Sequence, residues 1–308
     1  SVWVTVMGNI NTLAVAALCD VGCIVLAEGI SLDDAARAKA VQQHITVLST
    51  DMPIFDAALK VHERIHACLN YDLHIHSCLS PCGDDDMTPA NIVGMAMIKG
   101  LDLIAVTDHN SCKNCPAVLT MAEAYGLTAL PGMELTTSEE VHVVCLFADL
   151  KDALAFDEYV YSHLMAVPNN EKIFGKQQLY NADDEIIGTI PNLLINATTI
   201  SFDDVFALTR DYNGIMIPAH IDKTANSLLA NLGFIPPDSQ FTCAEIKDMS
   251  KYHELKKQHP YLEHCHIISD SDAHYLEHIN EPHYTLSVKS RNPKDILNAL
   301  TQPVGTTL

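Results

Sequence analysis

Basic and aromatic residues are scarce in this chain. It has 18 Lys and Arg against 39 Asp and Glu, a formal net charge of −21, one Trp and 6% aromatic residues. Proteins that bind duplex nucleic acid usually contact its phosphates through many Lys and Arg side chains, and single-strand channels are usually basic and lined by aromatic rings. The composition therefore predicts a small substrate and no duplex nucleic-acid partner. Bound cations would offset part of the acidity.

Long apolar runs are also missing. A membrane-spanning helix needs about 18–20 consecutive apolar residues, and the nearest candidate, residues 10–27, is interrupted by Asp20 and Gly22. No basic segment precedes it, so we expect neither a membrane span nor a signal peptide. The 10 Cys do not form the dense disulfide framework of a small secreted domain. Together with 16 His, they favour a reducing cytoplasm and metal chemistry.

The apolar pattern predicts a small domain followed by a large one. With 308 residues, 48% of them hydrophobic, the chain can bury two cores. Residues 1–66 alternate short apolar runs with helical segments, which predicts a small α/β domain with a parallel sheet. Residues 67–308 form the second predicted domain, whose expected strands are residues 72–75, 103–107, 128–133, 141–147, 214–219, 243–246 and 266–269.

Helical patterns between these strands indicate an α/β barrel or an open parallel sheet, with its chemistry at the carboxyl ends of the strands. The joint of residues 135–140 is too short for a parallel crossover. We therefore expect an antiparallel hairpin here, which would bring His142 back beside Glu134. An insertion at about residues 160–212, with a hairpin around residues 181–184, could form a lid or the wall of a pocket.

Imidazoles and carboxylates stand where the predicted strands end. Side-chain alternation places His74 and His76 on one face of their strand, and Glu134 follows an apolar run, where an unpaired carboxylate would be costly. Each residue alone could be a buried His or a capping acid, but a shared metal centre accounts for all of them. Their nitrogen and oxygen donors suit Zn, Mn or Fe. The candidate ligands are His74, His76, His109, Glu134, His142, His220, Asp272 and His274.

Residues 70–300 resemble the PHP (polymerase and histidinol phosphatase) superfamily, whose motifs match DLHIHS, AVTDHNS, PGMELTT with EVHVV, IPAH and SDSDAH in that order. The resemblance implies a distorted (β/α)7 barrel of PHP type and two or three divalent metal ions that cleave phosphate esters. It implies one ion on His74, His76, Glu134 and Asp272, a second on the bridging Glu134 with His142 and His220, and a third on His109 and His274.

One family ligand of the third ion has no obvious counterpart. PHP members often place Asp or His shortly after the HxH motif, where this chain has Cys82 or, as the alternative, Asp84. Cys78 and Cys82, with Cys112 and Cys115 after the neighbouring strand, could instead bind a separate zinc, although free thiols are the simpler expectation. Residues 1–66 resemble the DRTGG domain more loosely, and an oligomer could form through them.

The expected reaction is hydrolysis of a small phosphate monoester or nucleotide by water that the metal ions activate. His109, Glu134 and His274 are the expected catalytic residues, whereas Asp108 and Asp270 would orient ligands. A single-strand nuclease and a non-catalytic metal-binding sensor are alternative functions of the same residues. Candidate phosphate contacts, each of which could equally be a solvated surface charge, are Lys113, Arg210 and Lys223.

Overall fold

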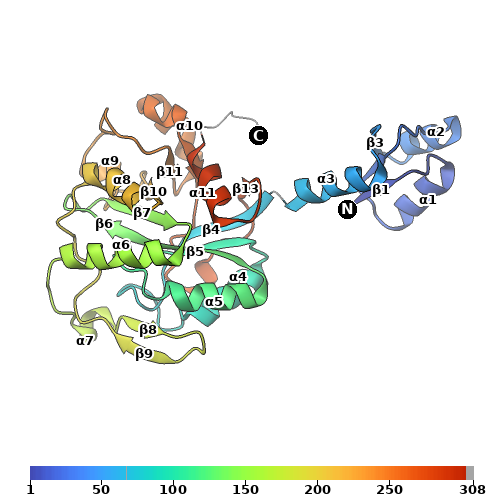
Figure 1. The fold of residues 1–308 in the computed structure, drawn as a ribbon. Helices are drawn as coiled ribbons and strands as arrows, with labels where there is room; N and C mark the ends of the chain where they lie inside the picture. The colour runs from blue at the N-terminus through green and yellow to red at the C-terminus, as the bar shows by residue number, and fades with distance from the viewer. Residues whose placement is uncertain (67, 303–308) are drawn as a thin grey trace. The chain divides into compact units, whose positions relative to one another are not determined.

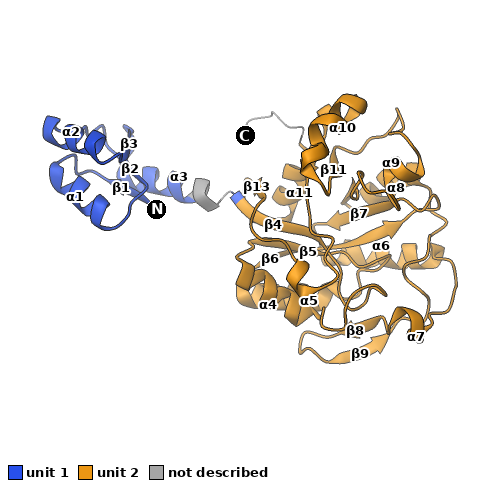
Figure 2. Cartoon of the chain, turned by 180° about the vertical axis from the view of Figure 1, so that it is seen from behind, with its two compact units in different colours: residues 1–68 blue, residues 69–308 orange. Residues whose placement is uncertain are grey.

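The computed structural model describes residues 1–66 and 68–302, the side chains of residues 63–66 excepted. Figure 1 shows the helices and strands along the chain, and Figure 2 colours its two compact units, residues 1–68 and residues 69–308. Across the described residues, none of the helices combines the length and the apolarity that crossing a bilayer requires.

The first unit is a three-stranded parallel sheet with the strand order β1-β2-β3, as the sequence predicted. Its core contains Leu13, Ile24 and Leu26. Asn9 and Asp33 begin two of its helices because their side chains accept backbone N–H groups of the first turn. The elements are β1 (Val2–Thr5), α1 (Ile10–Leu18), β2 (Cys23–Leu26), α2 (Asp34–Gln42), β3 (Thr46–Ser49) and α3 (Ile54–His66).

The second unit is built on a six-stranded sheet with the order β10-β7-β6-β5-β4-β13. Strands β4, β5 and β6 are parallel, whereas β7 pairs antiparallel with both β6 and β10. The predicted hairpin is confirmed, with Glu134 opposite Val144 and Thr136 opposite His142. The strands are β4 (Cys68–Ile75), β5 (Leu103–Val106), β6 (Thr128–Thr136), β7 (His142–Phe147), β10 (Gly214–Pro218) and β13 (Thr285–Ser287).

A separate parallel pair, β11 (Cys243–Glu245) and β12 (His266–Ile268), continues the curl of this sheet. The Ile221 N–H donates to the Glu245 carbonyl at 2.9 Å, and the His76 N–H donates to the Ala273 carbonyl at 2.9 Å. These bonds join the pair to the chain after β10 and to the end of β4. The result is the predicted distorted barrel, whose strands are not all linked by regular ladders.

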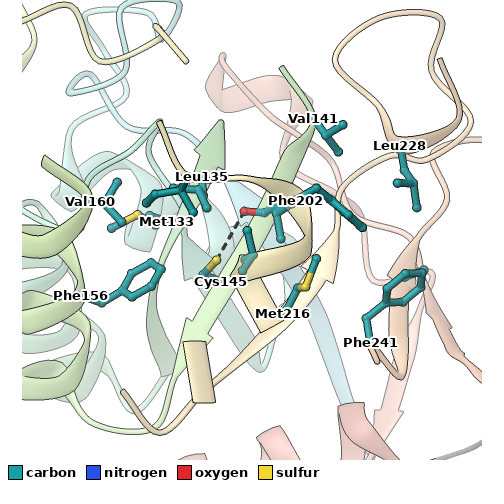
Figure 3. Close-up of a cluster of buried hydrophobic side chains, with 14 of the residues drawn as sticks. Met133, Leu135, Val141, Cys145, Phe156, Val160, Phe202, Met216, Leu228 and Phe241 are labelled. Atoms are coloured by element: carbon teal, nitrogen blue, oxygen red, sulfur yellow. Dashed lines mark hydrogen bonds between the residues drawn. The ribbon is translucent and has the colours of Figure 1, made fainter. Parts of the chain in front are cut away.

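Helices cover the sheet and close its core: α4 (Pro89–Lys99), α5 (Cys115–Tyr125), α6 (Leu150–His163), α8 (Phe202–Asp211) and α11 (Pro293–Thr301). Figure 3 shows Phe156 of α6 and Phe202 of α8 among the buried side chains Met133 and Cys145 of the sheet. Gly100 ends α4 with a φ of 77°, a left-handed conformation that favours glycine. The short helices α9 (Leu228–Asn231) and α10 (Tyr252–Gln258) lie in the later connections.

Between α6 and α8 the chain forms an excursion whose base is closed by an isolated bridge between Leu164 and Thr198. It contains α7 (Glu171–Phe174) and an antiparallel hairpin of β8 (Gln178–Tyr180) and β9 (Ile186–Thr189), where the sequence predicted a hairpin. The Asn114 amide donates to the Gln178 carbonyl at 3.1 Å and accepts the Tyr180 N–H at 3.0 Å. The hairpin is therefore fixed to the loop that precedes α5.

Candidate metal centre

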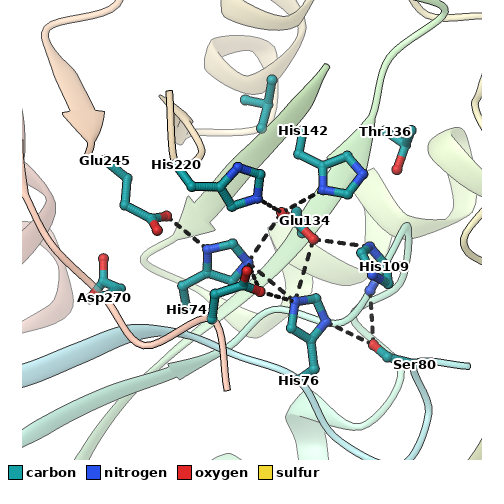
Figure 4. Close-up of polar contacts among 12 residues, drawn as sticks. His74, His76, Ser80, His109, Glu134, Thr136, His142, His220, Glu245 and Asp270 are labelled. Carbon is teal, nitrogen blue, oxygen red and sulfur yellow. Dashed lines mark hydrogen bonds and ion pairs between the residues drawn. The ribbon is translucent and has the colours of Figure 1, made fainter. Parts of the chain in front are cut away.

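Glu134 lies fully buried among imidazoles (Figure 4). Its two oxygens divide the rings between them. The distances from Oε1 are 2.9 Å to His142 Nδ1, 3.0 Å to His220 Nε2 and 3.2 Å to His74 Nε2. Those from Oε2 are 3.0 Å to His109 Nδ1 and 3.4 Å to His76 Nε2.

Asp272 forms the second acidic group of the cluster. Its Oδ1 lies 3.2 Å from His76 Nε2 and 3.5 Å from His74 Nε2. His274 stacks on His76 with ring centroids 4.3 Å apart, and its Nδ1 lies 2.9 Å from the Asp272 carbonyl oxygen. All eight residues predicted as ligands are therefore together, and we call this set the candidate metal centre.

The fold places these side chains for local reasons. Alternation along β4 directs His74 and His76 to the same side, and the short turn after β6 returns His142 to Glu134. His220 and Asp272 follow β10 and β12 with φ values of 31° and 48°, in the left-handed region that non-glycine residues seldom adopt. Such strained backbone conformations persist only where the surrounding structure enforces them, and they cluster at functional sites.

The donor atoms fall into three groups in which all members lie within 4.8 Å of one another. The first contains the four residues that the family resemblance assigns to one ion. The other two share His109, whereas the resemblance places it with the third ion alone. The groups are His74, His76, Glu134 and Asp272; His109, Glu134 and His142; and His76, His109 and His274.

Several buried atoms of the cluster have no hydrogen-bond partner. They include Glu134 Oε2, His109 Nδ1 and His220 Nδ1. Although Glu134 Oε2 and His109 Nδ1 are 3.0 Å apart, their orientation does not make a hydrogen bond. Leaving such atoms unsatisfied in the interior costs about 1–3 kcal/mol each. A cation between an imidazole lone pair and a carboxylate oxygen would satisfy both, so the residues present fit divalent metal ions.

The electrostatics of the cluster favour positive charge at the first group. Burial alone would raise the pKa of Glu134, but His142 and the other surrounding imidazoles hold it well below its usual range. Burial opposes protonation of His76, yet Asp272 and Glu134 raise its pKa to about 9. Burial and the nearby His76 lower the pKa of His109 to about 3 and that of His274 to about 4. These two rings are neutral near pH 7, as metal ligands must be.

A layer of polar groups holds the ligands from behind. His76 Nδ1 lies 3.0 Å from Ser80 Oγ, and the Ser80 hydroxyl donates to Asp108 at 2.7 Å. Asp270 accepts the Leu73 N–H at 2.6 Å, which fixes the strand that carries His74. Sequence reasoning missed Glu245, whose Oε2 lies 2.8 Å from His74 Nδ1. The sequence feature that could have identified Glu245 is an acidic residue at the carboxyl end of a predicted strand, the same feature that identified Glu134.

A pocket of about 480 Å³ opens onto the candidate metal centre. Its walls include Ile195 from the excursion, Cys82 and Lys223. The Lys223 ammonium contacts Asp272 Oδ2. The other two predicted phosphate contacts lie elsewhere, because Lys113 pairs with Asp157 and the exposed Arg210 lies over the Phe206 ring.

The four cysteines considered as an alternative, separate zinc site do not converge. Cys112 and Cys115 are buried in the hydrophobic core, and Cys115 Sγ lies 3.5 Å from the Gly132 carbonyl oxygen. Cys82 is exposed at the pocket. Within residues 1–66 and 68–302, no cysteine belongs to a group with metal-ligand spacing, and Asp84 does not either. The Asp84 carboxylate instead accepts the Asp86 N–H at 3.0 Å.

Comparison with known proteins gives matches of three kinds: a family model, curated proteins and solved structures. A family model described as PHP domain matches residues 72–302. An uncharacterized protein of Methanocaldococcus jannaschii is 30% identical over 98 residues, 29% of this chain and 57% of that protein. A 5'-3' exoribonuclease of Haemophilus influenzae is 24% identical over 139 residues, 44% of this chain and 46% of that protein. The chain thus spans about half the length of these curated relatives.

Among solved structures, the lesion-specific endonuclease PfuEndoQ from Pyrococcus furiosus shares the fold with a TM-score of 0.53 at 19% identity. The similarity covers 76% of this chain and 56% of that one. Another endonuclease Q structure, with a TM-score of 0.44 at 18% identity over 68% of this chain and 50% of that one, holds a 27-mer duplex substrate with an abasic lesion at its active site.

These relatives correct one prediction. We expected a small substrate and no duplex nucleic acid, but the similar proteins include an exoribonuclease and a lesion-specific endonuclease, whose substrates are nucleic acids. That prediction is wrong because it treated net charge as a property of the site. A formal charge of −21 counts acids far from the pocket, and it also counts carboxylates whose charge bound cations would neutralise.

Proposed function

Because this chain belongs to the PHP domain family, we propose that it is a metal-dependent nuclease, which hydrolyses a phosphodiester bond of a nucleotide inserted into the pocket of the candidate metal centre. The family match confirms the resemblance carried by the ordered motifs, and with it the predicted class of phosphoester hydrolases. The similarity of residues 1–66 to the DRTGG domain, and an oligomer formed through them, remain predictions.

The convergence on Glu134 carries this proposal. One buried carboxylate lies within 3.4 Å of nitrogens from five imidazoles, which come from four strands and the loops after them. A hydrogen-bonded core would satisfy these atoms, whereas here Glu134 Oε2 and His109 Nδ1 have no such partner. We assign the unsatisfied atoms to two or three divalent ions of Zn, Mn or Fe.

The size of the pocket favours a polymeric substrate that places one nucleotide at a time beside the candidate metal centre. Its volume of about 480 Å³ lies in the range of about 300–1,000 Å³ that holds a small ligand. Ile195 offers an apolar wall for a base or ribose, and Lys223 offers one positive charge for a phosphate. A nucleotide at a strand end, or one turned out of a damaged duplex, would fit this shape. The nuclease names of the relatives agree with such a substrate.

The chain's own residues would divide the chemistry. Divalent ions, when bound, neutralise charge on the phosphate and acidify water. Glu134 and Asp272, with the imidazoles of the candidate metal centre, would hold them. His274 Nδ1 is paired with the Asp272 carbonyl, so its other ring nitrogen is available at the pocket for an ion or for the proton of the leaving oxygen. When substrate binds, the Lys223 ammonium would leave Asp272 and contact a phosphate oxygen of the substrate.

The test is a panel of substrates. The protein is purified once in Mn²⁺ and once in Zn²⁺, and its bound metal is measured before the assay. The panel contains end-labelled single-stranded RNA and DNA, intact duplex DNA, duplex DNA with an abasic site, and p-nitrophenyl phosphate. We expect cleavage of at least one nucleic acid, abolished by EDTA and restored by metal. The product ladder shows whether cleavage begins at an end or within the strand.

The matched variants are Glu134→Gln in the centre and Glu254→Gln on the exposed surface of α10. We expect loss of bound metal and cleavage in the first and neither loss in the second. Hydrolysis of p-nitrophenyl phosphate with no attack on any nucleic acid would overturn the nuclease assignment. Metal-free protein that cleaves at the full rate would overturn the role of the centre.

A further inference from the structure

Glu245 is a fully buried carboxylate behind the candidate metal centre rather than in it. It ends β11, and its Oε2 lies 2.8 Å from Nδ1 of His74, which is itself fully buried. The opposite nitrogen of the same ring, Nε2, lies 3.2 Å from Glu134 Oε1. Figure 4 shows the His74 ring between the two carboxylates. The Glu245 contact therefore requires the proton on Nδ1 and leaves the Nε2 lone pair for a cation.

No other candidate imidazole among the described residues has a carboxylate within hydrogen-bond distance of its outer nitrogen; His274 Nδ1 lies 3.8 Å from Asp272 Oδ1. His76 Nδ1 reaches Asp108 only through the Ser80 hydroxyl. His220 Nδ1 has no hydrogen-bond partner. His142 directs Nδ1 inward to Glu134. The first group of ligands thus differs from the others because one of its rings is fixed directly by a carboxylate.

The position of Glu245 is costly for a merely structural group. Moving an ionised carboxylate from water to the interior costs several kcal/mol unless partners compensate. Here one oxygen has the His74 partner and the other, Oε1, has no hydrogen bond. A neutral side chain would fill the same space without this cost. What a carboxylate adds is a fixed tautomer and a more basic imidazole, and loss of such partners typically lowers metal affinity about 10- to 100-fold.

We propose that Glu245 is the positioning residue of the ion held by His74, His76, Glu134 and Asp272, and that it sets the affinity of this first group. The inference rests on the metal-binding part of the proposed function and is independent of the substrate. It predicts that the chain binds one ion more tightly than the others and that Glu245 controls this ion alone.

The experiment titrates metal-free protein with Co²⁺, whose visible absorption reports its coordination, and measures bound Zn²⁺ by mass spectrometry. Three variants are compared with the unaltered chain. Glu245→Gln keeps the size and an acceptor but removes the charge, whereas Glu245→Leu removes the acceptor as well. The matched control is Asp157→Asn, a buried carboxylate outside the candidate metal centre that accepts the Ser111 hydroxyl at 2.9 Å and the Cys112 N–H at 2.7 Å.

We expect the first equivalent of Co²⁺ to bind about 10- to 100-fold more weakly in Glu245→Leu, with Glu245→Gln affected less and later equivalents unchanged. Asp157→Asn should lose stability and keep its metal affinity. First-equivalent affinities equal to that of the unaltered chain in both Glu245 variants overturn the proposal, and so does an equal loss in Asp157→Asn. If Glu245→Leu does not fold, the affinity of Glu245→Gln for the first equivalent of Co²⁺ decides the outcome. Protein that binds metal in this way but cleaves no nucleic acid refutes only the nuclease assignment.

Discussion

Chelation should lower the melting temperature of the protein, because the candidate metal centre is assembled only in the folded state. A ligand present at 100 times its Kd stabilises the fold by about 2.7 kcal/mol. For a folding unit the size of residues 69–308, 1 kcal/mol shifts the melting temperature by about 2–4 °C. Loss of one ion should therefore lower it by about 5–11 °C. Three ligand groups share residues, so the loss of further ions would add to this value.

The assay is calorimetry of protein with Mn²⁺, after EDTA, and after Mn²⁺ is returned. Glu134→Gln removes the charge shared by two of the three ligand groups, so its melting curve should respond less to both treatments. Glu254→Gln should keep the full response, because it changes the same residue type on the surface. Identical melting curves before and after chelation, in a sample measured to have held metal, would refute the reasoning.

Three other changes test separate parts of the structure. Lys223→Ala should raise KM about 10- to 100-fold, as expected for a charged hydrogen bond worth about 1.5–3 kcal/mol, and Lys223→Arg should restore part of the loss. Phe156→Ala should lower the free energy of unfolding, measured in urea, by about 3–5 kcal/mol, because this ring is fully buried and its centroid lies 5.0 Å from that of the Phe147 ring. Burial lowers the pKa of His266, so its contribution to stability is present above the unfolded pKa of about 6.5 and is lost as the pH falls below that value. Urea unfolding of His266→Asn should show a smaller loss of stability between pH 6.5 and 5.

Local patterns predicted much of the fold. The expected strand at residues 103–107 is β5 (Leu103–Val106), and the expected strand at residues 141–147 is β7 (His142–Phe147). The hairpin after Glu134 followed from chain length alone, since six residues cannot make a parallel crossover. The predicted strands did not include β13 (Thr285–Ser287), which is three residues long.

The candidate metal centre was more predictable than its surroundings. Its residues end different strands, and the geometry of parallel strands brings such positions to one edge of the sheet. Glu245 was overlooked although β11 was predicted, because it lies outside the motifs that carry the family resemblance. Ile195 could not be assigned to the pocket, and Lys223 could not be distinguished from the other two candidate phosphate contacts, since their places depend on how the excursion and the loop after β10 pack.

The acidic composition and a nucleic-acid substrate are compatible if the bound ions supply the charge that captures phosphate. Lys223 is the one Lys or Arg that lines the pocket among the described residues. A single phosphate contact on a single strand gives a slope of about −0.7 in log affinity against log salt, so a fourfold rise in salt weakens binding about threefold. A protein with 6–10 phosphate contacts to duplex DNA would lose about 10³–10⁵-fold over the same rise. Binding of a single-stranded oligonucleotide should therefore depend weakly on salt and strongly on metal. Strong binding by metal-free protein, with a steep salt dependence, would place the phosphate contacts outside the candidate metal centre.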